Sequence, residues 1–544
     1  MPSTPPSEDE LTLVLGSIRT QDPDRPQASA MLVRGDRIVA IGSLADVAPA
    51  GVEGIRVHHA IGTVVPGFID SHVHTMIVGL ERRRLTVSEA GSIAEVVELI
   101  RLYLAANPDL DWAVIGAHFH EEDLADGRLP NRHDLDAVSG GVALYLDRRT
   151  HDAIVNTEAL RRAGITAETP DPEGASIERE ADGHPSGILI ERPAADLVFS
   201  QIPALTPEEM RVALLEAQSY LHSLGIVGAS EPGLVAAEIA AYQNLWAEGL
   251  LSLRTMAMPL GDTSLAPDTF MDGLEGLGVR TGFGDETLKV GPLKIYLDGT
   301  GGFSTALLSR DWPGLPGYHG TQVCPPETFR GLVDRCAAGG WSVAVHAVGD
   351  EAVRFALECF AEADKRRPIA PLRFSIMHGY LWPSHESMAE AARLGVTLST
   401  QPAMQWRVGA GIQHRFGQIA EDTAPLRDWF DAGVEVAAGS DGPDFLMAPL
   451  FGMWQARSRR VRGLDAPLGP AQAVTAEEAF AMYTTSGARY AYAENSRGRL
   501  APGYLADWVE LALDPVTATL DELEEKKEHA VKRTVVGGRV VYGQ

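Results

Sequence analysis

The segment Val64–Thr75, VVPGFIDSHVHT, joins an apolar run to a pair of histidines and guides the interpretation of the whole chain. The apolar run predicts a buried strand that ends at His72-Val73-His74. Because successive side chains on a strand alternate between its faces, His72 and His74 point to the same side. Such a pair suits chelation of a metal ion, although an isolated H-x-H is a weak signal.

Seven further apolar runs follow, and most are separated by helical patterns such as DEAVRFALECFAEADKRR. Repeated strand–helix units predict a parallel α/β fold, and eight strands fit a TIM-type (β/α)8 barrel over residues 64–494. A doubly wound open sheet is the rival, but no G-x-G-x-x-G follows the first strand. The eight predicted strands are Val64–His74, Ile226–Ser230, Leu253–Met258, Leu293–Asp298, Ser342–His346, Phe374–His378, Val396–Thr400 and Val434–Ser440.

The two ends of the chain show the same sequence pattern. Residues 11–63 and the last stretch, LADWVELAL with AVKRTVVGGRVVYG, alternate short apolar runs with turn residues, which predicts short antiparallel strands. We expect residues 1–63 and 495–544 to form a small composite β-sandwich. About 150 residues separate the first two barrel strands, too many for a plain βα connection. Residues 108–203 are therefore predicted to be an inserted subdomain.

Residues of the metal-ligand type fall at the ends of the predicted strands. Besides His72 and His74, they are Lys294, His346, His378 and Asp441. Any one of them alone is more often an ordinary buried polar residue. In a barrel, however, the carboxyl ends of the strands meet at one mouth, and coincidence would have to act at five strand ends. The combination predicts a metal site.

The residue types indicate how such a site would work. Three cysteines without C-x-x-C spacing leave nitrogen and oxygen as the ligands, which suits zinc. Catalytic zinc lowers the pKa of a bound water to about 7, and two ions about 3.5–4 Å apart also polarise a carbonyl. Asp441 would serve as the general acid and base.

Two interpretations of the Lys294 side chain are open. It is an ordinary lysine in a salt bridge, for instance with Asp298, or its neutral amine adds carbon dioxide. The carbamate formed in the second case is anionic and can bridge two metal ions.

Several motifs together resemble the amidohydrolase superfamily, in particular the amidohydrolase-3, or YtcJ-like, group, which includes N-substituted formamide deformylases. They are VVPGFIDSHVHT, KIYLDGTGGFSTA, HAVGDEAV, MHGY, GSDGP and GRLAPGYLADWVEL, with NRHDLDAV, THDAIVNTEALRRAGI and GHPSGILIE in the inserted segment. The resemblance covers nearly the whole chain and implies a barrel with a small β-sandwich.

The same resemblance implies a site with two divalent ions, expected to be zinc. His72 and His74 would bind the more buried ion and His346 and His378 the other, with carboxylated Lys294 bridging them. Asp441 would be both a ligand and the proton shuttle. The resemblance also implies a homodimer as the assembly.

This chain departs from the group's pattern at three places. Met377 stands where the group often has Glu. Met404 occupies the histidine position of the group's Q-P-x-H motif, and Glu510 stands where the group usually has an apolar residue. The first two changes bear on the substrate pocket rather than on the metal ligands.

Candidate substrate residues are His151, Phe119 and Trp312. His151 matches a position where the group tends to have histidine, and aromatic walls suit a hydrophobic substituent. A second H-x-H, His118-Phe119-His120, is either a rival metal site or a pocket or surface pair, and no partner ligands accompany it.

The chain of 544 residues carries a net charge of −28. So acidic a surface repels phosphate backbones and anionic membranes, so neither nucleic acid nor a membrane is an expected partner. The first residues lack a signal-peptide pattern and no long apolar run follows, which predicts a cytoplasmic protein.

We therefore predict a metal-dependent hydrolase that cleaves an amide-type C–N bond of a small molecule. N-substituted formamides, N-acyl amines and carbamates are the candidate substrates. The alternatives are a deaminase or cyclic-amide hydrolase of the same superfamily and, from another class, a non-catalytic metal- or ligand-binding protein.

Overall fold

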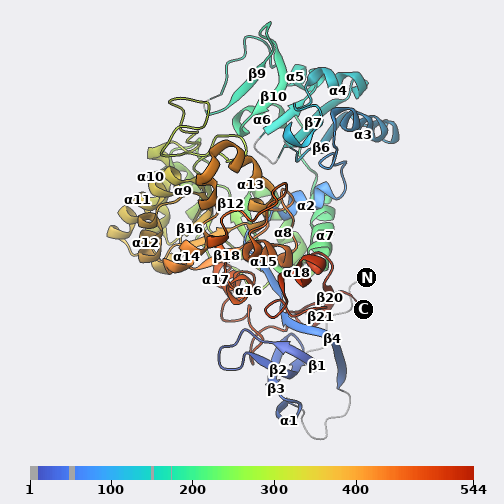
Figure 1. The fold of residues 1–544 in the computed structure, drawn as a ribbon, viewed down its shortest axis with the longest axis vertical. Coiled ribbons are helices and arrows are strands. Elements are labelled where there is room, and N and C mark those ends of the chain that lie inside the picture. Colours follow the sequence, from blue (N-terminus) through green and yellow to red (C-terminus); the bar gives the residue numbers. More distant parts are fainter. Residues whose placement is uncertain (1–9, 48–54, 120, 149–151, 173, 544) are drawn as a thin grey trace. The chain divides into compact units, whose positions relative to one another are not determined.

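The computed structural model describes residues 10–47, 55–119, 121–148, 152–172 and 174–543. The chain divides into two compact units (Figure 1), one formed by Met1–Thr75 with Leu214–Gln544 and the other by Met76–Ala213. The predicted insertion, 108–203, lies within the second unit. Helices α2 (Thr75–Glu81) and α7 (Pro207–Ser223) begin in one unit and end in the other.

Both chain ends contribute to one seven-stranded sheet in the first unit, and Figure 1 shows the blue strand β4 near the red strands β20 and β21. Its order is β21 (Arg539–Tyr542), β20 (Val531–Val536), β19 (Trp508–Leu511), β4 (Arg56–Pro66), β1 (Leu11–Arg19), β2 (Gln27–Arg34) and β3 (Arg37–Gly42). The expectation of purely antiparallel pairing was wrong for β1 and β4, which pair in parallel because both start at the same end of the sheet.

Glu510 on β19, one of the departures from the family pattern, is 3% exposed within this sheet. Its carboxylate accepts hydrogen bonds from the backbone N–H of Ile61 at 2.8 Å and contacts Nε2 of His58 at 2.8 Å. A buried charge with such partners is tolerated in a strand.

Two parallel sheets form the centre of the first unit. One has the order β13 (Leu288–Val290), β12 (Arg254–Pro259), β11 (Ile226–Leu234) and β5 (Phe68–Asp70). The other has the order β14 (Leu293–Tyr296), β15 (Val343–Gly349), β16 (Ser375–Leu381), β17 (Thr397–Thr400) and β18 (Val436–Ala438). Each of the eight predicted segments overlaps one of these strands, and β13 was not predicted.

The first predicted strand, Val64–His74, is divided in the structure. Its start belongs to β4 and the seven-stranded sheet, whereas Phe68–Asp70 forms β5 of a parallel sheet. Gly67 lies between them, where a Cβ atom would collide with the side chain of Val227. The missing side chain lets the chain pass close to β11 as it changes sheets.

Hydrogen bonds also connect the two parallel sheets to each other. The N–H of Gly261, beyond β12, donates to the carbonyl of Lys294 on β14 at 2.8 Å. The N–H of Ser71, beyond β5, donates to the carbonyl of Ala438 on β18 at 3.1 Å. The result is a mixed α/β fold with several sheets, in which the carboxyl ends of β5 and β18 are adjacent.

Helices follow most of these strands. In α11 (Asp350–Arg366), the buried residues recur every three or four positions, as a helix packed on a sheet requires, and it packs on β15 and β16. Acidic residues in its first turn and basic residues in its last turn complement the helix dipole. The other helices of the first unit are α1 (Leu44–Val47), α8 (Ala236–Ala247), α9 (Pro267–Glu275), α10 (Pro326–Gly339), α12 (His385–Leu394), α13 (Pro402–Phe416), α14 (Leu426–Asp431), α15 (Pro449–Ser458), α16 (Ala476–Met482), α17 (Thr485–Tyr490) and α18 (Leu520–Lys526).

The second unit has its own sheet and core. The strand order is β6 (Trp112–Gly116), β7 (Ala143–Arg148), β8 (Asp152–Val155), β10 (Pro185–Ile190) and β9 (Ser176–Arg179). Its helices are α3 (Ile93–Ala106), α4 (Arg132–Ser139), α5 (Thr157–Arg162) and α6 (Arg192–Phe199). Within the described part of the chain, no helix combines the length and the apolar character needed to cross a bilayer.

Candidate metal centre

Asp70, at the end of β5, fixes the loop after β18 beside the two histidines that follow it. Its carboxylate accepts hydrogen bonds from the backbone N–H of His72 and of Ser440, each at 3.0 Å. Burial raises the pKa of Asp70 to about 7 despite these bonds. Gly439 permits the close approach, because a Cβ there would collide with the N–H of His72. The sequence analysis missed Asp70, whose only signal is its position two residues before His72.

Asp441 follows β18 and contacts both histidines of the H-x-H pair. Its Oδ1 lies 3.3 Å from Nε2 of His72 and 3.5 Å from Nε2 of His74. The N–H of Asp441 also donates to the carbonyl of His72 at 2.7 Å, and its φ of 57° lies in the left-handed region. Although burial opposes ionisation, the electrostatic interaction with the His72 ring and the hydrogen bonds with both rings hold the pKa of Asp441 well below its usual range.

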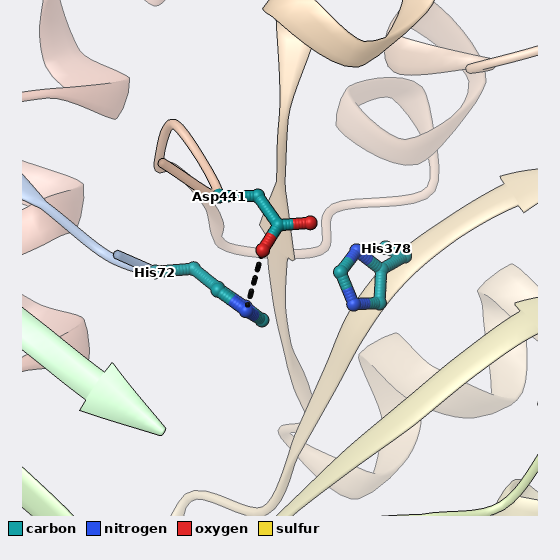
Figure 2. A group of neighbouring side chains, drawn as sticks. All are labelled: His72, His378 and Asp441. Carbon is teal, nitrogen blue, oxygen red and sulfur yellow. Dashed lines mark ion pairs between the residues drawn. The ribbon is translucent and has the colours of Figure 1, made fainter. Parts of the chain in front are cut away.

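His378, on β16, completes a group of three ligand-type side chains from three elements (Figure 2). One ligand atom each of His72, His378 and Asp441 lies within 4.8 Å of the other two. Burial lowers the pKa of His72 to about 4 and the pKa of His378 well below its usual value. Both rings are therefore neutral at pH 7, the form that binds metal ions.

Gln401, just after β17, sets the tautomer of His378. Its Oε1 lies 2.7 Å from Nδ1 of His378, and its Nε2 donates to the carbonyl of Ser399 at 3.2 Å. Because the amide oxygen only accepts, Nδ1 of His378 carries the proton and Nε2 carries the lone pair. Partners of this kind orient metal-binding histidines in proteins.

His346, on β15, lies beside His378, with 4.5 Å between the ring centres. Its Nε2 donates to the carbonyl of Gly299 at 3.2 Å, so Nδ1 carries the lone pair. The carboxylate of Asp298, 3.8 Å from Nε2 of His346, accepts hydrogen bonds from the N–H groups of Leu307, Val348 and Gly349. Asp298 thereby ties the loop after β14 to the end of β15.

Lys294, on β14, is fully buried, and burial lowers the pKa of its amine to about 7. Its Nζ lies 3.0 Å from Sδ of Met377 and 4.5 Å from the ring centre of Tyr296. The Tyr296 ring is in turn 5.3 Å from the ring of His346. These contacts place Lys294 beside the strands that carry His346 and His378, with a large neutral fraction of its amine near pH 7.

The predicted substrate residues lie in different surroundings. Trp312 is 1% exposed, donates from Nε1 to the carbonyl of Ala306 and packs against the ring of Phe416. Phe119 is 1% exposed within the hydrophobic core of the second unit. His118 pairs with Glu81 at 2.8 Å in that unit. His151 and His120 lie outside the described residues.

The donor set fits a divalent metal ion. Imidazole nitrogen and carboxylate oxygen are ligands that zinc prefers, and the three ligand atoms of His72, His378 and Asp441 converge. Among the described residues, none offers a hydrogen-bond partner to the buried Nδ1 of His72. Buried polar nitrogens are normally satisfied, so an unpartnered one in a cluster of ligands is consistent with a bound ion.

Comparison with known proteins agrees with this chemistry. The model of the Amidohydrolase family matches residues 62–542. The N-substituted formamide deformylase of Arthrobacter pascens is 29% identical over 546 residues, which cover 98% of each chain. The putative amidohydrolase YtcJ of Bacillus subtilis is 29% identical over 88% of each chain.

Solved structures share the fold. An uncharacterized metal-dependent hydrolase from Pyrococcus horikoshii superposes with a TM-score of 0.75 at 23% identity, over 96% of this chain and 100% of that one. At this identity the likeness concerns the fold alone.

Proposed function

Because the chain belongs to the amidohydrolase family and is a hydrolase, we propose that it uses two divalent metal ions, expected to be zinc, to cleave an amide-type C–N bond of a small molecule. The observation that carries the proposal is that ligand atoms of His72, His378 and Asp441, which lie after β5, on β16 and after β18, converge within 4.8 Å of one another. A metal-dependent hydrolase needs such a buried set of neutral imidazoles beside a carboxylate.

The proposal includes the architecture typical of the family. The two parallel sheets close into one barrel over residues 64–494, and residues 108–203 form its inserted subdomain. Residues 1–63 and 495–544 form the small β-sandwich. The hydrogen bonds from Gly261 to Lys294 and from Ser71 to Ala438 support closure, because they connect the two sheets at two places, after β12 to β14 and after β5 to β18.

The proposed division of the ligands between the ions is the one that the resemblance to the family implies. His72 and His74 would hold one ion and His346 and His378 the other, with Asp441 as a further ligand. Lys294 would bridge the ions as a carbamate, which a largely neutral buried amine can form. Bound ions would supply a water of lowered pKa and polarise the substrate carbonyl.

Asp441 is the residue that moves the proton. Its contacts with His72 and His74 both use Oδ1, which leaves Oδ2 to take the proton of the attacking water. The same oxygen then donates that proton to the departing nitrogen, which leaves as an amine. The lowered pKa of Asp441 keeps the carboxylate ionised, as its role as a base requires.

The substrate class is an N-substituted formamide, another N-acyl amine or a carbamate. The support is the 29% identity with a protein named N-substituted formamide deformylase, over nearly the full length of both chains. His151, Phe119 and Trp312 remain the proposed substrate contacts, and a homodimer remains the proposed assembly.

Metal analysis combined with a substrate screen tests the proposal. We expect about two divalent ions per chain and release of amine and acid from one or more N-formyl, N-acyl or carbamate compounds. Chelation should abolish turnover, and zinc should restore it. Release of ammonia from an aminated heterocycle would instead indicate a deaminase, and active protein with well under one ion per chain would refute the mechanism.

A further inference from the structure

A glycine-rich loop, residues 299–304 with the sequence GTGGFS, follows β14 and begins the long connection to α10. Three of its six residues are glycine, so the loop has little conformational preference of its own. Its position must therefore be set by contacts with other parts of the first unit of the chain.

Arg415, in the last turn of α13, contacts this loop at three residues. Its Nη2 donates to the carbonyl of Gly301 at 3.1 Å, and its Nη1 donates to the carbonyl of Gly302 at 3.4 Å and to Oγ of Ser304 at 2.9 Å. Within the described part of the chain, the guanidinium group meets oxygens of the backbone and of a hydroxyl group but no carboxylate. A planar fork with several donors suits this task, because one side chain can fix several residues at once.

The tip of the loop depends on being held in this way. Ser304 has a φ of 60°, in the left-handed region, which a residue with a Cβ atom keeps only where its surroundings impose it. Gly301 lies so close to Tyr380 on β16 that a Cβ atom would collide with the hydroxyl group. The guanidinium carbon of Arg415 also lies 5.8 Å from the ring centre of Trp312, farther along the same connection. The tip is thus fixed by α13 and β16 together.

The start of the same loop contacts the candidate metal centre. The carbonyl of Gly299 accepts the hydrogen bond from Nε2 of His346 at 3.2 Å, which leaves the lone pair of the ring on Nδ1. Asp298 fixes the base of the loop through the N–H groups of Leu307, Val348 and Gly349, but none of these bonds reaches the tip. The tip, two residues beyond Gly299, is the part that Arg415 holds.

We infer that Arg415 is a positioning residue of the metal centre. By fixing the tip of the glycine-rich loop, it keeps the carbonyl of Gly299 on Nε2 of His346, and the ring then presents Nδ1 to an ion. Partners that orient a metal-binding histidine change the metal affinity by about 10–100-fold. The inference rests on the proposed function only where it assigns an ion to His346, because the tautomer is a property of the metal-free protein.

Nitrogen NMR of metal-free protein labelled with ¹⁵N-histidine tests the positioning. In the wild type, the neutral His346 ring should carry its proton on Nε2, and the absence of its signals in His346→Asn identifies them. Arg415→Met keeps an unbranched side chain and removes every donor to the loop, so the ring should populate both tautomers. Arg415→Lys keeps the charge but not the planar fork, and should give an intermediate distribution.

Zinc affinities, measured by competition with a chromophoric chelator, test the consequence. Arg415→Met should weaken one of the two ions at least tenfold, the same ion that His346→Asn weakens, and leave the other unchanged. In the double variant, Arg415→Met should add nothing to the effect of His346→Asn, because both act through one ring.

Arg457→Met is the matched control. Arg457, on α15, is also half-buried, and its guanidinium group donates to the carbonyls of Pro515 and Ala518, which follow β19. It therefore fastens a loop of the seven-stranded sheet in the same manner, without a contact to a proposed ligand. Its loss should leave the tautomer of His346 and both zinc affinities unchanged.

Several results would overturn the inference. They are an Nδ1-protonated His346 ring in the wild type, an unchanged tautomer in Arg415→Met, and an equal loss of both ions in that variant, which would indicate general damage. If Arg415→Met does not fold, Arg415→Lys takes its place in both measurements. A wild-type protein that holds fewer than two ions would instead refute the proposed function, and the NMR comparison would still decide the role of Arg415.

Discussion

Nζ of Lys294 lies 3.0 Å from the thioether sulfur of Met377, a position where the related group often has glutamate. The amine is thus buried against an apolar, polarisable neighbour, and burial lowers its pKa to about 7. Sequence analysis assigned the Met377 departure to the substrate pocket. The structure adds a contact with the residue proposed to bridge the metal ions.

Lys294→Met should remove metal without harming the fold. The variant cannot form a carbamate, so we expect metal content to fall from about two ions per chain to one or fewer and turnover to fall at least a hundredfold. The melting temperature of the metal-free protein should hold or rise, because a desolvated amine is replaced by an apolar group. Metal analysis, calorimetry and a carbamate signal in ¹³C NMR after equilibration with ¹³C-bicarbonate check these points.

Lys289→Met is the matched control for this prediction. Lys289 lies on β13, the preceding strand along the chain, and is half-buried, whereas Lys294 is fully buried; its Nζ donates to the carbonyl of Tyr492. The control should keep both the metal ions and the NMR signal. Full metal content and turnover in Lys294→Met would contradict the bridging role.

Asp441→Asn tests the proton transfer. The amide cannot accept the proton at Oδ2, so kcat should fall by about 10²–10⁴ while His72, His74 and His378 still retain metal. Steady-state kinetics and metal analysis measure both effects. Asp431→Asn, a mostly exposed carboxylate on α14, is the control and should leave kcat unchanged. An Asp441→Asn enzyme with wild-type kcat would exclude the assigned role.

Gln401→Leu tests the orientation of His378. Loss of the Oε1 acceptor frees Nδ1 and the ring tautomer, so zinc affinity should fall about 10–100-fold. Competition with a chromophoric chelator measures the affinity. Gln401→Glu, which keeps an acceptor at Nδ1, should recover most of it. Equal losses in both variants would point to a packing defect rather than to ring orientation.

The positions of the strands could be predicted from the sequence more completely than the contacts between the strands. Period-two alternation predicts that His72 and His74 face the same side, and apolar runs place His346 and His378 on strands, so these positions follow from local pattern. Both His346 and His378, however, lie in the middle of β15 and β16 and not at the strand ends that the sequence predicts. The roles of Asp70 and Gln401 depend on the register between strands far apart in sequence, which no local pattern contains. The same holds for the parallel pairing of β1 with β4 and for the burial of Phe119 in its own core.

His222, on α7, should make the fold sensitive to mild acid. Its Nδ1 donates to the carbonyl of Ile226 at 2.8 Å, its Nε2 lies 2.9 Å from Oγ of Ser252, and burial lowers its pKa from 6.5 to about 4. Between pH 6.5 and pH 4 the unfolded chain therefore binds a proton that the folded chain does not. Stability is complete above pH 6.5 and falls as the pH drops toward 4, by on the order of 3 kcal/mol for this group.

His222→Gln isolates this contribution from that of the other buried histidines. The variant has no proton to take up at this position, so its free energy of unfolding should fall less steeply between pH 7 and pH 4.5 than that of the wild type. Denaturant titrations of metal-free protein across this range give the two slopes, each referred to its own value at pH 7, so that any general destabilisation cancels. His385→Gln, an exposed position on α12, should keep the wild-type slope. Identical slopes for His222→Gln and the wild type would mean that the folded protein admits the proton at His222, and that burial does not keep this ring neutral.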